Sequence, residues 1–315
     1  MSRLPLIVVN PASAGGATGR AWPGVASAVA RHFGPFEVAF TKRPGEAAEI
    51  AERAARSGRR LVIACGGDGT INEVANGLLR AESEAELGLL PSGTGGDFRR
   101  TLGVPQRAAD AAKALREGAA RSMDAGRVTF VNDVGAEESR FFVNVASFGM
   151  GGDVIRRVKS REGLPAGAAR LLGGRLSFAA AALQAAVTFE KPRVRVSLDG
   201  GAASHLNVAN FCVANARYFG GGMKIAPDAK VDDGRFDVVA IGDVSALTVL
   251  ANSYRLYLGT HLGMQEVRHA HARRVRADAA DGSTVKLEID GELAGRLPAE
   301  FELLPCALRV RCPPL

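Results

Sequence analysis

Three glycine-rich segments near the start of the chain each follow a short apolar run and precede a helical pattern. They span residues 10–20, 66–72 and 91–98. Glycine allows a tight turn and brings backbone N–H groups close to an anion, and the start of a helix adds partial positive charge. Because the carboxyl ends of parallel strands meet at one edge of a sheet, three such loops predict a polyphosphate site at that edge.

The spacing of these glycines differs from that of two common phosphate-binding motifs. No Gly-Lys-Ser/Thr follows them, as a Walker A loop requires, and the pattern is not Gly-x-Gly-x-x-Gly. A hydride-transfer cofactor is therefore disfavoured. The simpler alternative, that glycines after strands only make tight turns, explains one such loop more easily than three.

Up to about residue 126, short apolar runs alternate with helix-length segments. The runs are continuously apolar, which is typical of strands covered on both faces. The expected strands are 6–9, 36–40, 61–65 and 87–90, and the expected helices are 22–33, 45–56, 70–80 and 107–116. This alternation predicts a doubly wound, Rossmann-like α/β domain over residues 1–126.

From residue 127 onward the chain becomes rich in β-strand patterns, some of which alternate apolar and polar residues. The expected strands are 127–131, 140–148, 193–198, 206–214, 236–241, 267–277, 285–289, 301–304 and 307–312. Helical patterns at 167–188 and 245–259 interrupt them. We expect a β-sandwich C-terminal domain over residues 127–315, whose last strand, at about 300–315, is a candidate to pack back on the first domain.

The formal charge of +7 and a pI of about 9.6 suggest nucleic acid or an anionic membrane as partner. Only 6% of the residues are aromatic, and no recognition-helix motif is present, so nucleic-acid binding is not expected. The apolar helix predicted at 167–188 could receive acyl chains while basic residues meet anionic headgroups. These basic residues are Arg156, Arg157, Lys159, Arg161, Arg170 and Arg175. The alternative is a core helix with a solvated basic flank.

Cysteines and apolar stretches bear on the compartment. Cys65, Cys212, Cys306 and Cys312 show no Cys-x-x-Cys pairing, which is typical of buried thiols in a reducing cytoplasm. The most apolar stretch, 178–189, is much shorter than the ~20 residues that cross a bilayer, so no transmembrane helix is expected. We expect a cytoplasmic protein that binds membranes peripherally, and a homodimer remains an open possibility.

Two acidic residues are candidates for chemistry. A carboxylate at Asp68, among phosphate-binding amides, would repel phosphate unless Mg²⁺ lay between them; the alternative is that Asp68 or Thr70 caps the next helix. Asp290-Gly291-Glu292 ends a strand of alternating apolar residues, where Glu292 could project as a general base. The alternative there is an ordinary Asp-Gly hairpin turn.

Two histidines, His269 and His271, are expected to share one face of a strand. That arrangement could hold a metal ion, but no third ligand is evident nearby in the sequence. We therefore interpret the pair as residues of a surface strand.

The segment Gly66-Gly67-Asp68-Gly69-Thr70 resembles the nucleotide-binding signature of diacylglycerol kinase-like lipid kinases, NAD kinases and 6-phosphofructokinases. Five other motifs resemble those of the lipid kinases and occur in the same order. They are Asn10-Pro11 and the segments 91–98, 142–149, 226–234 and 289–292. The clearest departure is Gly96, where that family usually has asparagine.

The resemblance implies a nucleotide-binding domain like that of NAD kinase and phosphofructokinase, and transfer of the γ-phosphoryl group of ATP to a lipid hydroxyl. The residues implied in binding ATP are Asn10, Thr41, Gly66, Gly67, Asp68, Gly69, Thr70, Ile71, Asn72 and Thr94. Asp68 would also position Mg²⁺, and Glu292 would act as general base. A second Mg²⁺ would be held by Asp233 and the backbone carbonyls of Lys230 and Arg235.

The acceptor is less well defined. Diacylglycerol is the lipid we favour, over a sphingoid base, ceramide or phosphatidylglycerol. Two alternatives stay open: a kinase of a soluble acceptor such as NAD, and a non-catalytic binding protein of the same fold.

Overall fold

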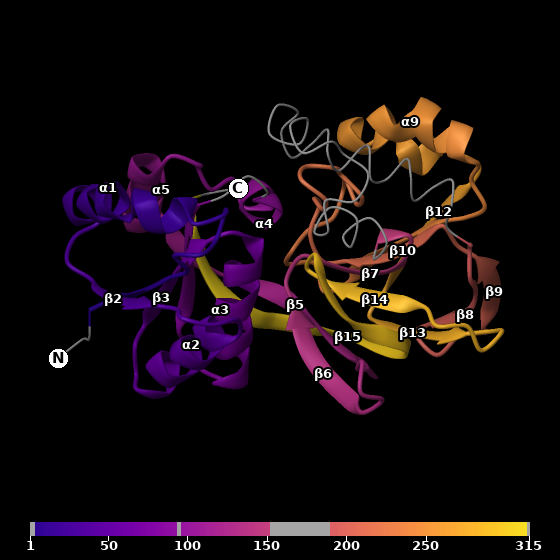
Figure 1. Ribbon diagram of the computed structural model, residues 1–315, viewed down its shortest axis with the longest axis horizontal. Coiled ribbons are helices and arrows are strands. Elements are labelled where there is room, and N and C mark those ends of the chain that lie inside the picture. Colours follow the sequence, from indigo (N-terminus) through magenta and orange to yellow (C-terminus); the bar gives the residue numbers. More distant parts are fainter. Residues whose placement is uncertain (1–3, 93–95, 152–189, 314–315) are drawn as a thin grey trace. The chain divides into compact units, whose positions relative to one another are not determined.

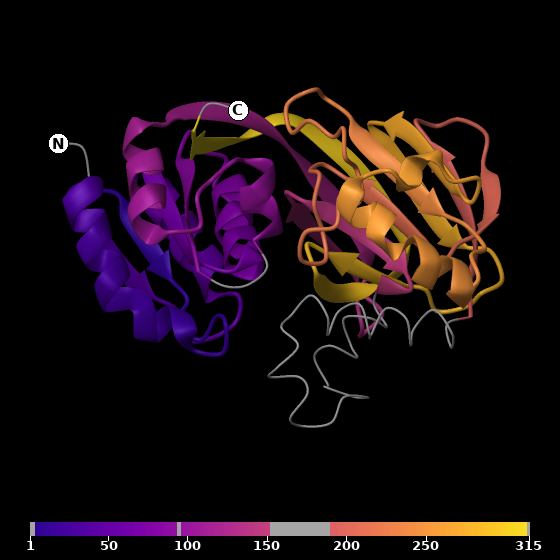
Figure 2. The same ribbon diagram turned by 90° about the horizontal axis from the view of Figure 1, so that it is seen from above.

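A computed structural model describes residues 4–92, 96–151 and 190–313 of the chain. Chain contacts divide it into two compact units. The first unit comprises Met1–Ala125, Val231–Asp233 and Leu304–Leu315, and the second comprises Gly126–Lys230 and Gly234–Leu303. Two long strands, β5 (Ala119–Val131) and β15 (Glu292–Cys312), contribute residues to both units and pair with each other. Figure 2 shows their magenta and yellow ribbons side by side.

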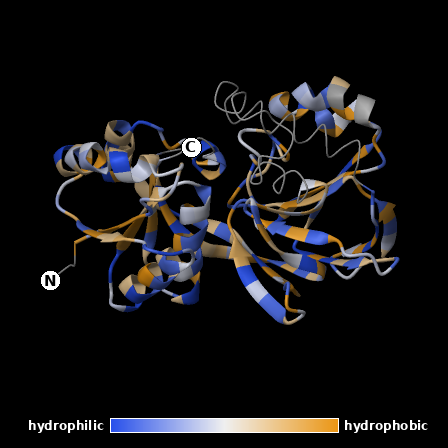
Figure 3. Ribbon diagram, in the orientation of Figure 1, coloured by the Kyte–Doolittle hydropathy of each residue, from blue (hydrophilic) through white to orange (hydrophobic). Residues whose placement is uncertain are grey.

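The first unit is a doubly wound α/β domain, as predicted. Its strands are β1 (Leu6–Val9), β2 (Glu37–Phe40), β3 (Leu61–Gly66) and β4 (Glu86–Pro91). They pair in parallel in the order β2-β1-β3-β4, and the last part of β15 adds a parallel neighbour to β4. The strands β1 and β3 are fully buried, in keeping with their continuous apolar sequences. Figure 3 shows the same strands as predominantly hydrophobic.

Helices cover both faces of this sheet. They are α1 (Ala17–His32), α2 (Glu46–Arg56), α3 (Asp68–Arg80), α4 (Asp97–Thr101) and α5 (Ala108–Glu117). The helices α1 and α5 contact each other on one face, and α2 and α3 contact each other on the opposite face (Figure 1). A stripe of small side chains on α2, including Ala47, Ala51 and Ala55, is buried in the second pair. The 3.6-residue periodicity of the sequence therefore reports the faces that pack on the sheet.

The second unit is a β-sandwich, as predicted. Its remaining strands are β6 (Glu137–Phe142), β7 (Val145–Gly149), β8 (Arg193–Leu198), β9 (Ser204–Asn207), β10 (Asn210–Ala214), β11 (Phe236–Ile241), β12 (Val267–Ala272), β13 (Arg274–Ala279) and β14 (Lys286–Ile289). The order β12-β11-β10-β7-β14-β15 is antiparallel throughout, and β9-β8-β13 is joined to it by pairing of β13 with a later part of β15. Five phenylalanines from different strands pack together in the core: Phe142, Phe148, Phe211, Phe236 and Phe301.

Several predicted strands are divided or joined differently. The run 140–148 is broken at Val143 and Asn144, and 206–214 and 267–277 are each two strands. The two runs after residue 300 belong to one strand, β15. Helix α4 was not predicted because its five residues are too few to show a period.

The two predicted helical inserts have different outcomes. The pattern 245–259 forms helix α9 (Ala246–Leu258), which begins after the capping residue Ser245 and is followed by a short 3₁₀ turn, η1 (His261–Gly263). The pattern 167–188, with its six basic neighbours, lies outside the described residues. Among the residues that are described, no helix has the length and apolar character needed to span a membrane.

The cysteines are free thiols, but the expectation that all are buried is wrong for Cys306, which is exposed. Burial raises the pKa of Cys65, at the end of β3, to about 12. Cys212 in the second unit is also fully buried, and its pKa is raised by burial and by the nearby Glu288. These two thiols are therefore protonated and unreactive in the folded protein.

Candidate active site

The three glycine-rich loops lie at the carboxyl ends of adjacent parallel strands, as the sequence predicts. The first follows β1, the second follows β3 and the third follows β4. Backbone bonds fix the ends of these strands to one another: the amide of Asn10 donates to Cys65, and that of Ser92 donates to Gly66. Side-chain hydrogen bonds then join each loop to the other two, which makes a single cluster.

The first and second loops are joined through Asn10 and Thr70. The Asn10 side-chain amide donates to the Thr70 hydroxyl at 3.1 Å. Thr70 is buried and lies against Gly66, where an added Cβ would stand 2.4 Å from the threonine Oγ1. Only glycine at position 66 leaves room for this contact.

The second and third loops are joined through Asp68. Its carboxylate accepts three successive backbone N–H groups at the start of α4: Gly96 at 2.7 Å, Asp97 at 3.2 Å and Phe98 at 3.4 Å. Asp68 therefore caps α4 and not its own helix α3, whose N-cap residue is Gly67. Gly96 adopts a φ of 68°, a left-handed conformation that asparagine also tolerates. The exchange of asparagine for glycine therefore suits this backbone.

The first and third loops are joined by a row of hydroxyl groups. The Thr18 hydroxyl lies 2.5 Å from that of Ser13 and 2.7 Å from that of Ser92. Thr18 is buried in the first turn of α1. The three loops are thus held by side chains that lie within the cluster, and no loop depends on its own turn alone.

This arrangement leaves backbone donors at the start of α3. The first intrahelical bond runs from the Ile71 amide to the Gly67 carbonyl at 3.1 Å. The amides of Asp68, Gly69 and Thr70 precede it and have no acceptor within the helix. Together with the positive end of the helix dipole, they make a site suited to phosphate oxygens.

Two arginines of α4 add positive charge beside the loops. Arg100 forms an ion pair with Asp97 at 2.7 Å. Arg99 is held against the Val104 carbonyl and Gln106, and its pKa is lowered by burial and by the neighbouring Arg100. Neither arginine is indicated by a sequence pattern, because both follow the third motif directly and lie on a helix of only five residues.

The other nucleotide-site residues inferred from sequence differ in what they offer. Thr41 is buried at the end of β2, and its amide donates to Val9. Ile71 is a core residue with 1% exposure, so its side chain contributes packing. The side chain of Asn72 accepts from Asn76 one turn later. Thr94 lies outside the described residues.

Glu73 has a role that sequence reasoning did not assign. Its carboxylate accepts the backbone N–H groups of Gly45 at 3.0 Å and Ala47 at 3.1 Å. Those amides are at the start of α2, so Glu73 caps that helix from its position on α3. No local pattern announces this contact, because the partners are 26 and 28 residues away along the chain.

In the second unit, Glu292 follows a turn that hydrogen bonds to the Asp290 carboxylate stabilise. The Asp290 carboxylate accepts the N–H groups of Val143, Asn144 and Val145 at 3.0, 3.0 and 2.9 Å. The first two of these amides lie in the break between β6 and β7, and the third belongs to the first residue of β7. Asp290 itself adopts a φ of 48° and Gly291 a φ of 84°, so the turn is left-handed at both residues. Glu292, the first residue of β15, is exposed.

The residues inferred for a second metal ion lie in or next to the short segment 231–233. Its Val231 carbonyl accepts the Asp124 amide at 2.7 Å, and Asp232 lies 3.6 Å from Arg121. Asp233 is half-buried, whereas Lys230 and Arg235 are exposed.

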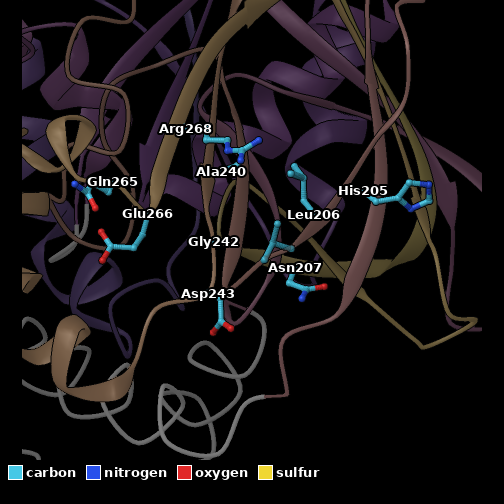
Figure 4. Close-up of a pocket in the computed structure, with 10 residues that line it drawn as sticks. His205, Leu206, Asn207, Ala240, Gly242, Asp243, Gln265, Glu266 and Arg268 are labelled. Atoms are coloured by element: carbon cyan, nitrogen blue, oxygen red, sulfur yellow. The ribbon is translucent and has the colours of Figure 1, made fainter.

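A separate hollow of about 280 Å³ lies in the second unit, beside β9, β11 and β12 (Figure 4). Its charged wall residues include Asp243, Glu266 and Arg268. It contains none of the residues that the sequence analysis assigned to nucleotide, metal or catalysis.

Comparison with known proteins identifies the family. Residues 5–128 match the family described as "Diacylglycerol kinase catalytic domain", and residues 144–312 match "YegS C-terminal NAD kinase beta sandwich-like domain". The "Diacylglycerol kinase" of Bacillus subtilis (strain 168) is 30% identical over 258 residues, which cover 82% of this chain and 79% of that protein. The chain belongs to the diacylglycerol kinase-like family of lipid kinases.

Other known proteins are also similar to this chain. A Pseudomonas aeruginosa protein named "Probable lipid kinase YegS-like" is 33% identical over 283 residues, covering 88% of this chain and 84% of that protein. A diacylglycerol kinase structure from Bacillus anthracis str. Sterne shares the fold, with a TM-score of 0.72, 23% identity, and coverage of 99% of this chain and 97% of that one. Yeast NADH kinase shows a more distant likeness in fold, with a TM-score of 0.50 and 11% identity.

Proposed function

We propose that the chain transfers the γ-phosphoryl group of ATP to the hydroxyl group of a lipid, diacylglycerol, in a reaction that requires Mg²⁺. The observation that carries the proposal is the cluster of three loops joined by Asn10–Thr70, Asp68–Gly96 and Thr18–Ser92. It presents the first-turn amides of α3 at the carboxyl edge of a parallel sheet, where nucleotides bind in open α/β folds.

The nucleotide phosphates would be bound mainly by backbone. The amides of Gly69 and Thr70 supply donors, and the α3 dipole stabilises negative charge. Asn10 and Thr41 line the same carboxyl edge of the sheet, and Thr94 would complete the third loop. Phosphoryl transfer depends largely on positioning and charge neutralisation, so a rigid set of donors is the main requirement.

Asp68 fits a role beside Mg²⁺. A carboxylate offers about four lone-pair positions, and three are used by the amides of residues 96–98. The remaining acceptor capacity suits a Mg²⁺ ion that keeps several waters and takes most of its ligands from phosphate. When bound, such an ion would neutralise charge that develops on the phosphate oxygens. Asp68 would orient that ion while keeping the third loop in place.

Glu292 would act as the general base. The attacking hydroxyl must lose its proton as it bonds to phosphorus, and a carboxylate within hydrogen-bond reach accepts it. The side chain is exposed on a turn that three amide bonds to Asp290 hold. Asp290 is engaged by the backbone, which favours Glu292 over Asp290 for this role.

A second Mg²⁺ remains part of the proposal. Asp233 would supply a carboxylate, and Lys230 and Arg235 would supply backbone carbonyls, which are the oxygen ligands that Mg²⁺ prefers. Its role would be structural, because its ligands lie within residues 230–235, which include none of the residues proposed for ATP or for proton transfer.

Diacylglycerol is proposed as acceptor because relatives that match most of the chain carry that name. The NAD kinase alternative is supported only by a distant likeness in fold. We also propose that the protein is cytoplasmic and meets its substrate at an anionic membrane surface. The homodimer stays a possibility that an oligomer measurement would decide.

The test is an assay with labelled ATP, Mg²⁺ and vesicles that contain diacylglycerol, with NAD, phosphatidylglycerol and a sphingoid base as parallel acceptors. Glu292→Gln is expected to lower kcat by about 10²–10⁴-fold, because the base is lost. Its free energy of unfolding should stay within about 0.5 kcal/mol, since the side chain is exposed. Glu300→Gln, an exposed glutamate on the same strand, is the control. Near-normal turnover by the Glu292 variant would refute its role as base, and labelling of NAD alone would refute the lipid acceptor.

A further inference from the structure

Three side chains that could bind a metal converge on one face of the second unit, and none of them is among the residues proposed above for ATP, Mg²⁺ or proton transfer. Asp237 comes from β11, and His269 and His271 come from the neighbouring strand β12. In the antiparallel register Asp237 lies directly opposite His271, and His269 lies opposite Val239 two residues along. Because side chains two apart share a face, all three point to the same side of the sheet.

The donor atoms are close enough for one ion. His269 Nε2 lies 2.8 Å and His271 Nε2 lies 3.4 Å from the same carboxylate oxygen of Asp237. Ligands of a tetrahedral zinc ion, at about 2.0–2.1 Å from the metal, stand roughly 3.3 Å apart. The His271–Asp237 distance already has this value. The shorter His269–Asp237 distance, 2.8 Å, is that of a hydrogen bond. A bound ion would take the place of the proton in this bond, and the imidazole and the carboxylate would move slightly apart.

Burial of the three groups also suits a metal site. The Asp237 side chain is 3% exposed, while those of His269 and His271 are 25% and 40% exposed. A carboxylate this deep in the sheet needs a positive partner, because an isolated buried charge is costly. The exposed side of the imidazoles gives an ion access and leaves a position for water.

We propose that Asp237, His269 and His271 form a binding site for a divalent transition metal, with Zn²⁺ as the best match. Two imidazoles and one carboxylate are a donor set that suits zinc and its first-row neighbours. Mg²⁺ and Ca²⁺ prefer oxygen ligands and would bind here poorly. The site is therefore chemically separate from any Mg²⁺ that accompanies a nucleotide.

The position of the site in the sheet indicates what the ion would do. Strand β12 is at the end of the sheet order, bonded to β11 on one side, and the connection between the two strands carries α9 and η1. A metal ion bound by residues of both β11 and β12 would stabilise the pairing of β12 with β11. It would also restrain the connection between the two strands. The role is structural, since none of the three residues belongs to the nucleotide or acceptor machinery proposed above.

The test is a zinc-binding titration of the full, untagged chain after treatment with a chelator. We expect one Zn²⁺ per chain, and one Co²⁺ with the intense visible absorption of a four-coordinate site. His269→Gln and His271→Gln should each weaken zinc binding by at least about tenfold, because loss of even an outer partner of a metal ligand costs that much. The double variant should lose the cobalt spectrum. His205→Gln, an exposed histidine on β9, is the matched control and should bind like the wild type.

Two outcomes would overturn the proposal. If the wild type binds no Zn²⁺, the three residues form only a hydrogen-bonded Asp–His cluster. If the double histidine variant binds one Zn²⁺ as tightly as the wild type, the ion occupies another place. Because buried Asp237 could be needed for folding, the more exposed His271 variant carries the test, with circular dichroism to confirm its fold. An excess of Mg²⁺ should not displace the zinc.

Discussion

The two glycine-containing motifs of this lipid kinase family member use an aspartate in the same way but leave different groups for chemistry. Asp68 in the first unit and Asp290 in the second each accept three successive backbone N–H groups of another loop. In the first unit the groups available to bind a ligand are the backbone amides in the first turn of α3. In the second unit the group on offer is a side chain, the exposed carboxylate of Glu292.

The glycines of the two motifs are also required for different physical reasons. At Gly66 the backbone is ordinary but the space is closed, because an added Cβ would stand 2.4 Å from Thr70 Oγ1 and 2.7 Å from Thr70 Cβ. At Gly291 an added Cβ would have no described atom within 4 Å, but φ is 84°. One glycine is thus required by packing and the other by backbone conformation. The first site is built by close packing of loops, and the second by the path of one turn.

The largest effect that would test this comparison is expected from Gly66→Ala. Rotation of Thr70 moves its hydroxyl but not its Cβ, so the backbone must shift, at a cost of about 2–3 kcal/mol in free energy of unfolding. Gly291→Ala should cost only about 1 kcal/mol, the price of a left-handed residue with a Cβ. Both values can be measured by urea denaturation.

Two further variants distinguish space from conformation. Gly291→Asn should recover much of the loss, because asparagine tolerates left-handed φ, whereas Gly66→Asn should not. Gly67→Ala is the control within the first motif, since the one described atom within 4 Å of its Cβ would be the Ser92 carbonyl oxygen, at 3.9 Å. If Gly66→Ala were as stable as Gly67→Ala, the packing argument for the first site would be wrong.

The second prediction compares the two aspartates directly. Asparagine keeps one acceptor oxygen but turns an NH₂ group toward a backbone N–H, so a carboxylate that accepts three amides loses at least one bond. Asp290→Asn, whose three bonds are all 3.0 Å or shorter, should cost about 2 kcal/mol, and Asp68→Asn, with bonds of 3.2 and 3.4 Å, about 1 kcal/mol. Hydrogen exchange at residues 143–145 and 96–98 reports each loop separately.

The comparison of Asp68 with Asp290 has a control and an outcome that would contradict it. Asp133→Asn, an exposed aspartate in the turn after β5, should change stability by less than about 0.5 kcal/mol. Faster exchange at 96–98 in Asp68→Asn without change at 143–145, and the reverse in Asp290→Asn, is the expected pattern. Equal effects at both loops in either variant would contradict the local role of these carboxylates.

Features that depend on local sequence patterns could be predicted, and features that depend on contacts between distant residues could not. The strands β1 to β4, the helices α1, α2, α3, α5 and α9, and the three loops depend on local patterns, and the sequence predicts each of them. The break at Asn144 was missed because it is imposed by Asp290, 146 residues away. The continuity of β15 was missed because Pro305 and Cys306, which has a φ of 54°, interrupt the apolar alternation.

The candidate sites show the same limit. The cluster of loops was predictable because the carboxyl ends of parallel strands meet by topology. The third member of the His269 and His271 group was not, since Asp237 comes from a strand some thirty residues earlier and is brought opposite His271 only by the register. The Arg99 and Glu73 contacts likewise depend on which loop faces which helix, and periodicity does not contain that information.

The smallest predicted effect concerns Glu73, an acidic residue of α3 that directly follows the segment 66–72. Like Asp68 it holds the start of another helix, because its carboxylate accepts the amides of Gly45 and Ala47. Glu73→Gln keeps one acceptor but removes the charge that interacts with the α2 dipole, so it should lower the free energy of unfolding by about 0.5–1 kcal/mol. The loss should shrink in high salt, because salt screens the charge.

Turnover and a surface control decide whether Glu73 is only structural. ATP-dependent lipid phosphorylation by Glu73→Gln should stay near that of the wild type, in contrast to Glu292→Gln. Glu84→Gln, which breaks only an exposed ion pair with Arg309, should change stability by less than about 0.5 kcal/mol. A large loss of kcat in Glu73→Gln with unchanged stability would place this carboxylate with Glu292, and the contrast between a first unit that acts through its backbone and a second that acts through a side chain would fail.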